Sequence, residues 1–333
     1  MAKTVNGAFE EFMKDIVNLD KDITSQARSS RDNLVANIME FSNQTDFFRL
    51  CSDFNIYFGS FARRTKCRPL DDVDIMIGIA AEGATYDNTA SWDDISIVSN
   101  RAIAMQNECS NEDGTLNSTK VINKFKKKLQ EVREYKRSDV HRSGEAVVLN
   151  LKSKEWSFDI VPCFHTVKES DGRDYYLIPN GSGKWKKTDP RKDRDHVSQT
   201  NQDNDGKVLE LIRLCKKWNK VKNAKTIPSY LLETMVIGYC DSTNNLSDYI
   251  DFRFRDALQH IANHAFLSVD DMKDIQGNIN TLTYDEKCTL RDKAQLDYEK
   301  ACEAWIFEQK KDQKAAIGKW EEILGKDFPD YDE

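Results

Sequence analysis

The sequence has no long apolar run, and this absence argues against a protein with membrane-spanning helices. No stretch of its 333 residues approaches the ~20 apolar residues that a membrane-spanning helix needs. The first residues, MAKTVNGAFEEFMKDIVNLD, place acidic side chains among the apolar ones and lack the uninterrupted core of a signal peptide. We therefore expect a cytoplasmic protein that does not contact a membrane.

Metal-binding cysteine motifs and a positive net charge are also missing. The eight cysteines include no Cys-x-x-Cys pair and no Cys-His cluster at zinc spacing, so we expect small buried side chains and a few exposed thiols. Lysine and arginine number 49 against 56 acidic residues, a net charge of −7, which gives no overall attraction for nucleic acid. The basic runs KFKKK (124–128) and KWKKTDPRKDR (184–194) are local, and we interpret the first as a solvated helix face.

Hydrophobic periodicity divides the chain into two parts. Up to about residue 180 the patterns alternate, with helices predicted near 9–17, 24–41, 91–108 and 118–135, and strands at 54–58, 73–79, 145–153, 155–164 and 175–179. This alternation is typical of an α/β domain. After the polar stretch 178–196 the strand patterns stop, and helices are predicted at 205–221, 227–240, 249–265 and 285–324. We predict one domain at residues 1–180 and a helical lobe at residues 181–333.

A Gly-Ser turn is followed by acidic residues inside apolar strands. In the stretch FGSFARRTKCRPLDDVDIMIGI, Asp72 and Asp74 point to the same face of a strand, about 7 Å apart along it. A third carboxylate, Asp159, lies in the later strand SFDIVP. Carboxylates that converge on two Mg²⁺ ions suit nucleotidyl transfer, because one ion activates the attacking hydroxyl and the other steadies the leaving pyrophosphate. Gly59 permits a sharp turn, and Ser60 with neighbouring amides can hold a triphosphate.

The order of these motifs is similar to that of DNA polymerase β-type nucleotidyltransferases. Further motifs, YYLIPNGSGKWKKTDP, LIRLCKKWN, IPSYLLE and WEEILGKDFP, narrow the resemblance to the bacterial cGAS-like nucleotidyltransferases (CD-NTases), which synthesise cyclic oligonucleotide signals in anti-phage (CBASS) defence. The resemblance extends from about residue 50 to the end of the chain. It implies a bilobed fold, in which an α/β nucleotidyltransferase core with a mixed β-sheet and a helical lobe enclose an active site in the cleft between them.

The resemblance also implies roles for residues of the core. Asp72, Asp74 and Asp159 match the acids that bind two Mg²⁺ ions, with Mn²⁺ as the alternative metal, and Asp159 is the expected acceptor or orienter of the hydroxyl proton. Gly59 and Ser60 match the turn that meets the nucleotide phosphates.

Other residues match nucleotide contacts of the family. Lys216 matches the lysine that reaches the triphosphate from the second lobe, with Lys217 as the alternative. Ser229 matches a serine that contacts phosphate, and Tyr230 matches a tyrosine that stacks on a base. Arg64 and Thr65 follow the Gly-Ser turn and are expected to contact substrate, whereas we interpret their neighbour Arg63 as part of a solvated basic loop.

The function that this resemblance implies is Mg²⁺-dependent synthesis of a cyclic di- or trinucleotide from NTPs, ATP among them, with release of pyrophosphate. A downstream effector would bind the product, an operon-encoded regulatory partner is implied as well, and activation by nucleic acid is not expected. One alternative is a template-independent RNA nucleotidyl transferase of the poly(A) or CCA-adding type, which would need a larger basic surface than a net charge of −7 supplies. The other is a catalytically inactive binding module, which the three intact acids disfavour.

Overall fold

The chain folds into two compact units. The structure is a computed structural model that describes residues 2–221, 227–243 and 245–332. The first unit, called the sheet unit below, comprises Lys21–Ala62 and Leu70–Arg194. The second, the helical unit, comprises Met1–Asp20, Arg63–Pro69 and Asp195–Glu333. This division differs from a single boundary at residue 180, because two early segments pack with the C-terminal helices.

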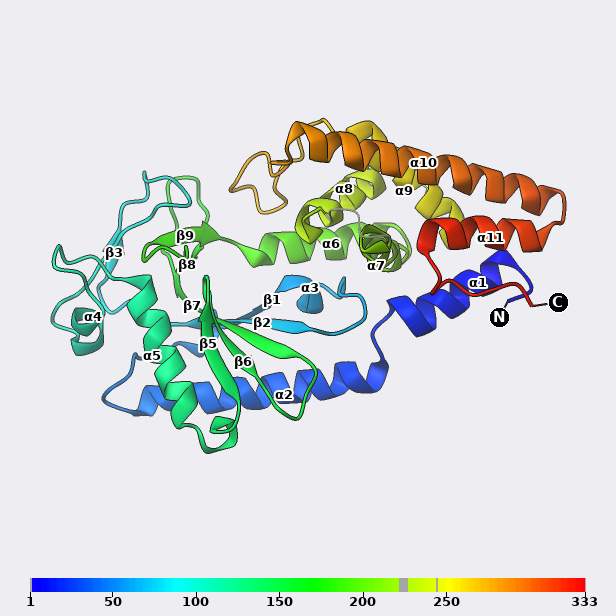
Figure 1. Cartoon of the computed structure of the whole chain (residues 1–333). Coiled ribbons are helices and arrows are strands. Elements are labelled where there is room, and N and C mark those ends of the chain that lie inside the picture. The colour runs from blue at the N-terminus through cyan, green and yellow to red at the C-terminus, as the bar shows by residue number, and fades with distance from the viewer. Residues whose placement is uncertain (1, 222–226, 244, 333) are drawn as a thin grey trace. The chain divides into compact units, whose positions relative to one another are not determined.

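The sheet unit is built around a mixed β-sheet with the strand order β1-β2-β7-β6-β5 (Figure 1). Its strands are β1 (Ile56–Phe58), β2 (Asp72–Gly78), β5 (Asp139–Ser143), β6 (Ala146–Asn150) and β7 (Ser157–His165). β2 and β7 run parallel to each other, whereas the other neighbours in this order are antiparallel. The end of β7 also pairs with β8 (Tyr176–Pro179), which in turn pairs with β9 (Trp185–Thr188). The predicted α/β core with a mixed sheet is therefore confirmed.

Two long helices, α2 (Lys21–Met39) and α5 (Ser118–Glu131), pack against this sheet. α5 begins where the Asn117 side chain accepts hydrogen bonds from the backbone N–H groups of Thr119 and Lys120, which satisfies donors that the first turn leaves unpaired. The apolar residues of α5 that are buried lie at helical spacing: Val121, Ile122, Phe125 and Leu129. Both helices were predicted, and each is followed by a short 3₁₀ helix, at Glu40–Asn43 and Arg133–Tyr135. A third 3₁₀ helix, Ser52–Phe54, precedes β1.

The helix predicted at residues 91–108 is wrong for most of its length. Only α4 (Ala104–Glu108) is helical there, and it follows β4 (Ile97–Val98), which pairs with β3 (Thr85–Tyr86). The buried residues Ile95 and Ile97 are two positions apart, as in a strand. In addition, the backbone of Ile95 exchanges two hydrogen bonds with the backbone of Trp185. Pairing with a distant strand thus overrides the local helical pattern.

The polar stretch 178–196 was predicted to be rich in turns, but it contains regular structure. It contains β9, where Trp185 is fully buried and its Nε1 donates to the Leu116 carbonyl at 2.9 Å. α6 (Pro190–Asp203) follows. Proline is well suited to the first helical position, because the N–H that it lacks would have no partner in the helix.

The helical unit contains the helical stretches predicted in the second half of the chain, but the stretch 285–324 forms two helices instead of one. The helices are α7 (Val208–Asn219), α8 (Ser229–Asp241), α9 (Ile250–His264), α10 (Tyr284–Gln309) and α11 (Gln313–Leu324). It also contains α1 (Val5–Phe12), which continues as a π-helix at Met13–Val17. The ring of Phe9 on α1 makes edge contacts with Trp320 and Phe328, with centroids 4.9 and 5.1 Å apart. These buried aromatic contacts explain why the first residues belong to this unit.

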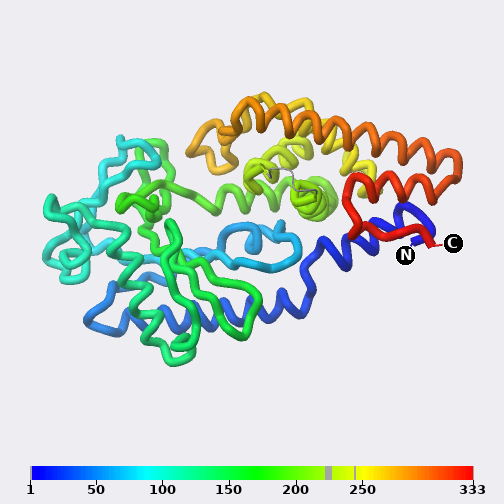
Figure 2. The backbone as a smooth tube through the Cα atoms, viewed as in Figure 1, coloured from blue at the N-terminus to red at the C-terminus, as the bar shows by residue number. Residues whose placement is uncertain are grey.

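The two ends of the described chain lie side by side in the helical unit, as Figure 2 shows. The backbone N–H of Ala2 donates to the Asp330 carbonyl at 2.9 Å, and that of Asp332 donates to the Ala2 carbonyl at 3.0 Å. In the part of the chain that the structure describes, no helix combines the length and apolar character needed to cross a membrane. All eight cysteines are unbridged; five are buried and three are partly exposed, as predicted.

Candidate active site

Three carboxylates lie on one face of the central sheet. Asp74 and Asp159 are register partners in the parallel pair of β2 and β7, so their side chains leave the sheet on the same side. Asp72 lies two residues before Asp74 on β2 and therefore shares that face. All three residues are partly exposed. The fold thus brings the three predicted acids together at the start of two neighbouring strands.

The same face becomes apolar farther along the strands. A small hydrophobic cluster lies there, and its buried members include Ile56, Met76, Ala146, Val161 and Cys163. On the opposite face, the residues between and after the acids are also buried, namely Val73, Ile75, Phe158 and Ile160. Carboxylates at three positions of an otherwise apolar sheet add little to its packing and are costly to desolvate. Their presence indicates a binding or catalytic function at this end of the strands.

Gly59 brings the backbone against one of these carboxylates. β1 ends at Phe58, the register partner of Asp74, and the single-turn helix α3 (Gly59–Ala62) follows directly. Gly59 has a φ of 71°, and a Cβ atom added to it would lie 1.8 Å from Asp74 Oδ2. Glycine alone combines this left-handed conformation with the missing side chain. The predicted turn, with Ser60 next in the chain, therefore lies beside a predicted acid.

The donor set has the chemistry of a Mg²⁺ site. Three carboxylates supply the hard oxygen ligands that Mg²⁺ prefers, and substrate phosphates and water normally complete its shell. Within residues 2–221, 227–243 and 245–332, however, no group of three or more His, Cys, Asp or Glu side chains is arranged to hold a metal ion. The strand positions of the three acids fit the predicted metal site.

Lys216 lies in a buried ion-pair cluster of the helical unit. Its Nζ is 2.5 Å from Glu233 Oε2, and it donates to Thr65 Oγ1 at 3.2 Å. The side chains of Lys216 and Glu233 are only 6% and 0% exposed. Burial lowers the pKa of the Lys216 ammonium, and the carboxylate of Glu233 opposes this effect. Lys217, the alternative to Lys216, instead forms an ion pair with Asp327 at 2.8 Å.

Arg63 belongs to the same cluster, so the prediction of a solvated residue was wrong. Its Nε lies 2.7 Å from Glu233 Oε1, and its side chain is 9% exposed. Burial alone would raise the pKa of Glu233, but Arg63 and Lys216 together hold it at about 2. The basic sequence around Arg63 gave no sign of this partner, which lies 170 residues farther along the chain.

Arg64 and Ser229, two further predicted contacts, are exposed. Arg64 has a φ of 64°, and its carbonyl accepts a hydrogen bond from Arg213 Nη1 at 2.7 Å. Ser229 is the first residue of α8, directly after Pro228 at the N-cap. Both positions are accessible to a ligand of their own unit.

Tyr230 combines a packing contact with partial exposure. Its hydroxyl donates to Asp271 Oδ1 at 2.7 Å, and the ring packs against the hydrophobic core of the helical unit. Two cations approach the ring, Lys273 with Nζ 3.9 Å from the centroid and Arg63 with Cζ 5.7 Å from it. The ring therefore has a fixed orientation before any nucleotide base stacks on it.

Glu233 was not predicted from the sequence. It lies in the stretch IPSYLLETMV, where it interrupts apolar residues of α8, as Asp159 interrupts an apolar strand. Thr65, which was expected to contact substrate, is instead buried with Glu233, and both are 0% exposed.

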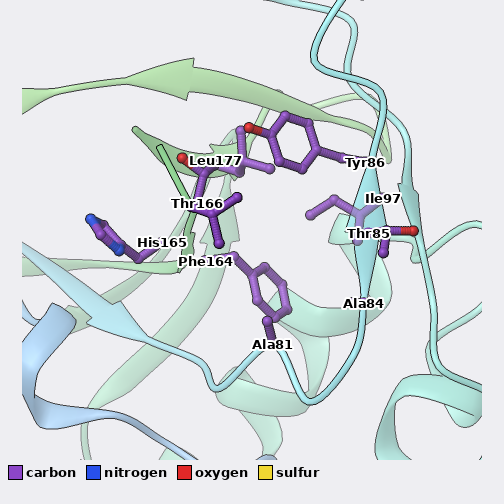
Figure 3. Close-up of a pocket in the computed structure, with 10 residues that line it drawn as sticks. Ala81, Ala84, Thr85, Tyr86, Ile97, Phe164, His165, Thr166 and Leu177 are labelled. Atoms are coloured by element: carbon purple, nitrogen blue, oxygen red, sulfur yellow. The ribbon is translucent and has the colours of Figure 1, made fainter. Parts of the chain in front are cut away.

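The sheet unit also contains an apolar pocket of about 300 Å³, at the opposite end of β2 and β7 from the acids. Figure 3 shows the side chains of Tyr86, Phe164 and Leu177 directed toward this space, whereas His165 points away from it. The Tyr86 hydroxyl donates to Glu169 Oε1 at 2.5 Å. No carboxylate lines the pocket, so it is separate from the candidate metal site.

Comparison with known sequences reveals similarity to enzymes that make cyclic nucleotides. Residues 105–201 match the Second Messenger Oligonucleotide or Dinucleotide Synthetase (SMODS) domain. A probable cyclic nucleotide synthase of Bacillus cereus (strain VD146) is 39% identical over 338 aligned residues, which cover 100% of both chains. A cyclic AMP-AMP-AMP synthase of an Acinetobacter species is 26% identical over 190 residues, or 54% of this chain and 53% of the relative.

Solved structures support the same assignment at the level of the fold. Two structures of CdnC of E. coli MS115-1 match with a TM-score of 0.70. One is a complex with HORMA-deltaN, and the other is CdnC with ATP. The sequence identity is 15%, and the match covers 97% of this chain and 97% or 98% of the CdnC chains. Because the Bacillus relative is similar over its full length, this chain belongs to the bacterial CD-NTases, the nucleotidyltransferases that synthesise cyclic oligonucleotides.

Proposed function

We propose that this enzyme joins NTPs, ATP among them, into a cyclic di- or trinucleotide second messenger. In each step a 2′- or 3′-hydroxyl of one nucleotide attacks the α-phosphate of another, and the bond from that phosphorus to pyrophosphate breaks. The linear product then reorients, and a last attack closes the ring. One observation carries the proposal: Gly59 lies against Asp74, which faces Asp159 across the parallel strand pair.

We assign the metal site to Asp72, Asp74 and Asp159, which would hold two Mg²⁺ ions or, alternatively, Mn²⁺. Bound Mg²⁺ would lower the pKa of the attacking hydroxyl and neutralise charge on the leaving pyrophosphate. Asp159 orients the attacking hydroxyl or accepts its proton. The shared sheet face of the three acids supports this assignment.

We assign the substrate phosphates to Gly59, Ser60 and Arg64. Gly59 leaves open the space beside Asp74 that any side chain would fill. Ser60 is partly exposed and Arg64 is exposed. A hydroxyl, backbone amides and a guanidinium are groups that bind phosphate oxygens well.

In the helical unit, we assign Lys216 and Ser229 to phosphate and Tyr230 to stacking on a base. Lys216 and Arg63 both form ion pairs with the carboxylate of Glu233. An ammonium or guanidinium group forms strong hydrogen bonds with phosphate oxygens. The Tyr230 ring is partly exposed and fixed in orientation by Asp271, and both properties suit a stacking platform.

The setting proposed for this reaction is the bacterial cytoplasm during anti-phage defence. There an effector would bind the product, and a partner encoded in the same operon would regulate synthesis. CdnC has been solved with ATP and with HORMA-deltaN, which supports ATP as a substrate and a protein as the regulator here. An RNA nucleotidyl transferase and an inactive binding module are not favoured, because the relatives are cyclic nucleotide synthases.

The test is incubation of the purified protein with Mg²⁺ and all four labelled NTPs, followed by mass spectrometry of phosphatase-resistant and nuclease-digested products. We expect a cyclic product from the wild type and from Asp71→Asn, which alters an exposed acid next to Asp72 but outside β2. We expect none from Asp74→Asn. Products that consist only of linear tails on added RNA would contradict the proposal.

A further inference from the structure

The segment Arg63–Pro69 connects the two parts of the proposed site in the sheet unit. It directly follows α3, which carries Gly59 and Ser60. It ends at Pro69, three positions before Asp72 at the start of β2. The segment itself packs with the helical unit. Whatever fixes its position therefore constrains, through the chain, both the phosphate turn and the first of the acids.

Glu233 on α8 is the centre of the contacts that hold this segment. Its Oε1 accepts from Arg63 Nε at 2.7 Å, and its Oε2 accepts from Thr65 Oγ1 at 3.0 Å and from Lys216 Nζ at 2.5 Å. Two of these three donors belong to the segment, and the third comes from α7. Because Glu233 and Thr65 are 0% exposed, no water can replace these contacts without opening the core.

Further hydrogen bonds hold the backbone of the segment. Lys216 Nζ donates to the Thr65 carbonyl at 3.3 Å, and Arg213 Nη1 donates to the Arg64 carbonyl at 2.7 Å. Near the other end, the backbone N–H of Arg68 donates to the Val17 carbonyl at 2.9 Å. Glu233 thus holds the Lys216 ammonium where it donates to the backbone of the segment.

Glu233 has no route to a substrate of its own. It is fully buried, and both of its oxygens already accept hydrogen bonds. Its loss would leave two buried cations, Arg63 and Lys216, without their shared anion, and such cations move toward water. The effect of Glu233 on the reaction must therefore act through the residues that it holds.

We propose that Glu233 is a positioning residue: its ion pairs with Arg63 and Lys216 and its hydrogen bond with Thr65 fix the segment Arg63–Pro69, and thereby the geometry of the Gly-Ser turn and Asp72. The consequence for catalysis rests on the proposed function of the turn and the acids. The claim that Glu233 fixes the segment does not depend on the proposed function. The structural role of Glu233 and its effect on catalysis can therefore be tested separately.

The first measurement is amide hydrogen exchange of the full chain, compared between wild type and Glu233→Gln. Glutamine keeps the size of the side chain and removes its charge. We expect faster exchange in peptides that cover residues 59–74, with little change in α9 and α10. The control is Asp297→Asn, an acid-to-amide change at a buried position of α10 whose carboxylate accepts from Trp218 Nε1 at 2.7 Å. It should leave the exchange of residues 59–74 unchanged.

The second measurement is steady-state synthesis of the cyclic product at a temperature where each variant is folded. We expect kcat/KM for ATP of Glu233→Gln to fall about tenfold or more, because the turn, the acids and Lys216 all lose the positions that Glu233 fixes. Glu233→Asp, which keeps the charge, should recover part of this loss. In the double variant Arg63→Met/Glu233→Gln, one cation is removed with the anion, so stability should recover while kcat/KM stays low.

Unchanged exchange at residues 59–74 in Glu233→Gln would overturn the proposal. So would a kcat/KM that recovers together with stability in the double variant, since Glu233 would then support only the fold. If the wild type makes no cyclic product, the proposed function fails, and the exchange measurement alone decides whether Glu233 fixes the segment.

Discussion

At the scale of single residues, glycine is required at position 59 for two separable reasons. Its φ of 71° lies in the left-handed region, and its Cα lies against the carboxylate of Asp74. Gly144 offers a comparison, because it has a φ of 52° but nothing within 4 Å of an added Cβ atom. The two glycines therefore separate the backbone requirement from the steric one.

We predict that Gly144→Ala costs only the left-handed conformation, about 1–2 kcal/mol of the free energy of unfolding, and keeps synthesis near the wild-type rate. Gly59→Ala should carry the same cost and also displace the Asp74 carboxylate. A displacement of about 1 Å in a catalytic group lowers turnover by up to about a hundredfold. Urea denaturation and initial rates of product formation check both variants. Wild-type turnover in folded Gly59→Ala would show that the contact with Asp74 has no role in the reaction.

At the scale of elements, α7 and α8 pack through apolar residues but also share a buried charged cluster. α8 is buried along most of its length, from Leu231 to Ile237, and Glu233 is the acidic residue within that stretch. The pKa of Glu233 is held at about 2 by Arg63 and Lys216 against the opposing effect of burial. The pairing of these helices with the segment Arg63–Pro69 is therefore sensitive to pH.

This sensitivity has a definite sign. Because the folded-state pKa of about 2 lies below the ordinary glutamate value of 4.5, the stabilisation is complete above pH 4.5 and is lost as the pH falls toward 2. A shift of this size corresponds to roughly 3 kcal/mol. We predict that the wild type is more stable than Glu233→Gln at pH 6 and that the difference shrinks steadily between pH 4.5 and pH 2. Urea denaturation of both proteins across this range measures it, and a difference independent of pH would contradict the ionic pairing.

At the scale of the whole molecule, the three acids on one sheet face repel one another unless a cation lies between them. Functional sites commonly carry such a cost to stability when their ligand is absent. A ligand that binds only the folded site raises stability by mass action, by about 2.7 kcal/mol at a hundredfold excess over Kd. The melting temperature thus reports on the site without any need for turnover.

We predict that Mg²⁺ with a non-hydrolysable NTP raises the melting temperature of the wild type and raises that of Asp74→Asn much less. Without metal, Asp74→Asn should be as stable as the wild type or more so, because asparagine is nearly isosteric and removes one of the repelling charges. Thermal melts of both proteins, with and without the ligands, measure this. A variant that is clearly destabilised without metal, or that keeps the full shift, would show that Asp74 is a structural acid.

The sequence by itself determined the features that depend on neighbours along the chain. Asp72 and Asp74 alternate with apolar residues, and that spacing alone predicts a shared face. The helix of α5 and most helices of the second half follow from apolar residues at helical spacing, and the Gly-Ser turn follows from the conformational freedom of Gly59. These patterns are local, because a strand or a helix imposes a fixed repeat on the side chains that it buries.

Only the tertiary structure decided the features that depend on residues far apart. Residues 91–98 form a turn and a short strand instead of a helix because Ile95 pairs with Trp185, and the first residues join the helical unit because Phe9 packs against Trp320. Arg63 is buried rather than solvated because the carboxylate of Glu233 approaches it from α8. A strand partner, an aromatic neighbour and a counter-ion each become available only when the chain is folded, and no local repeat encodes them.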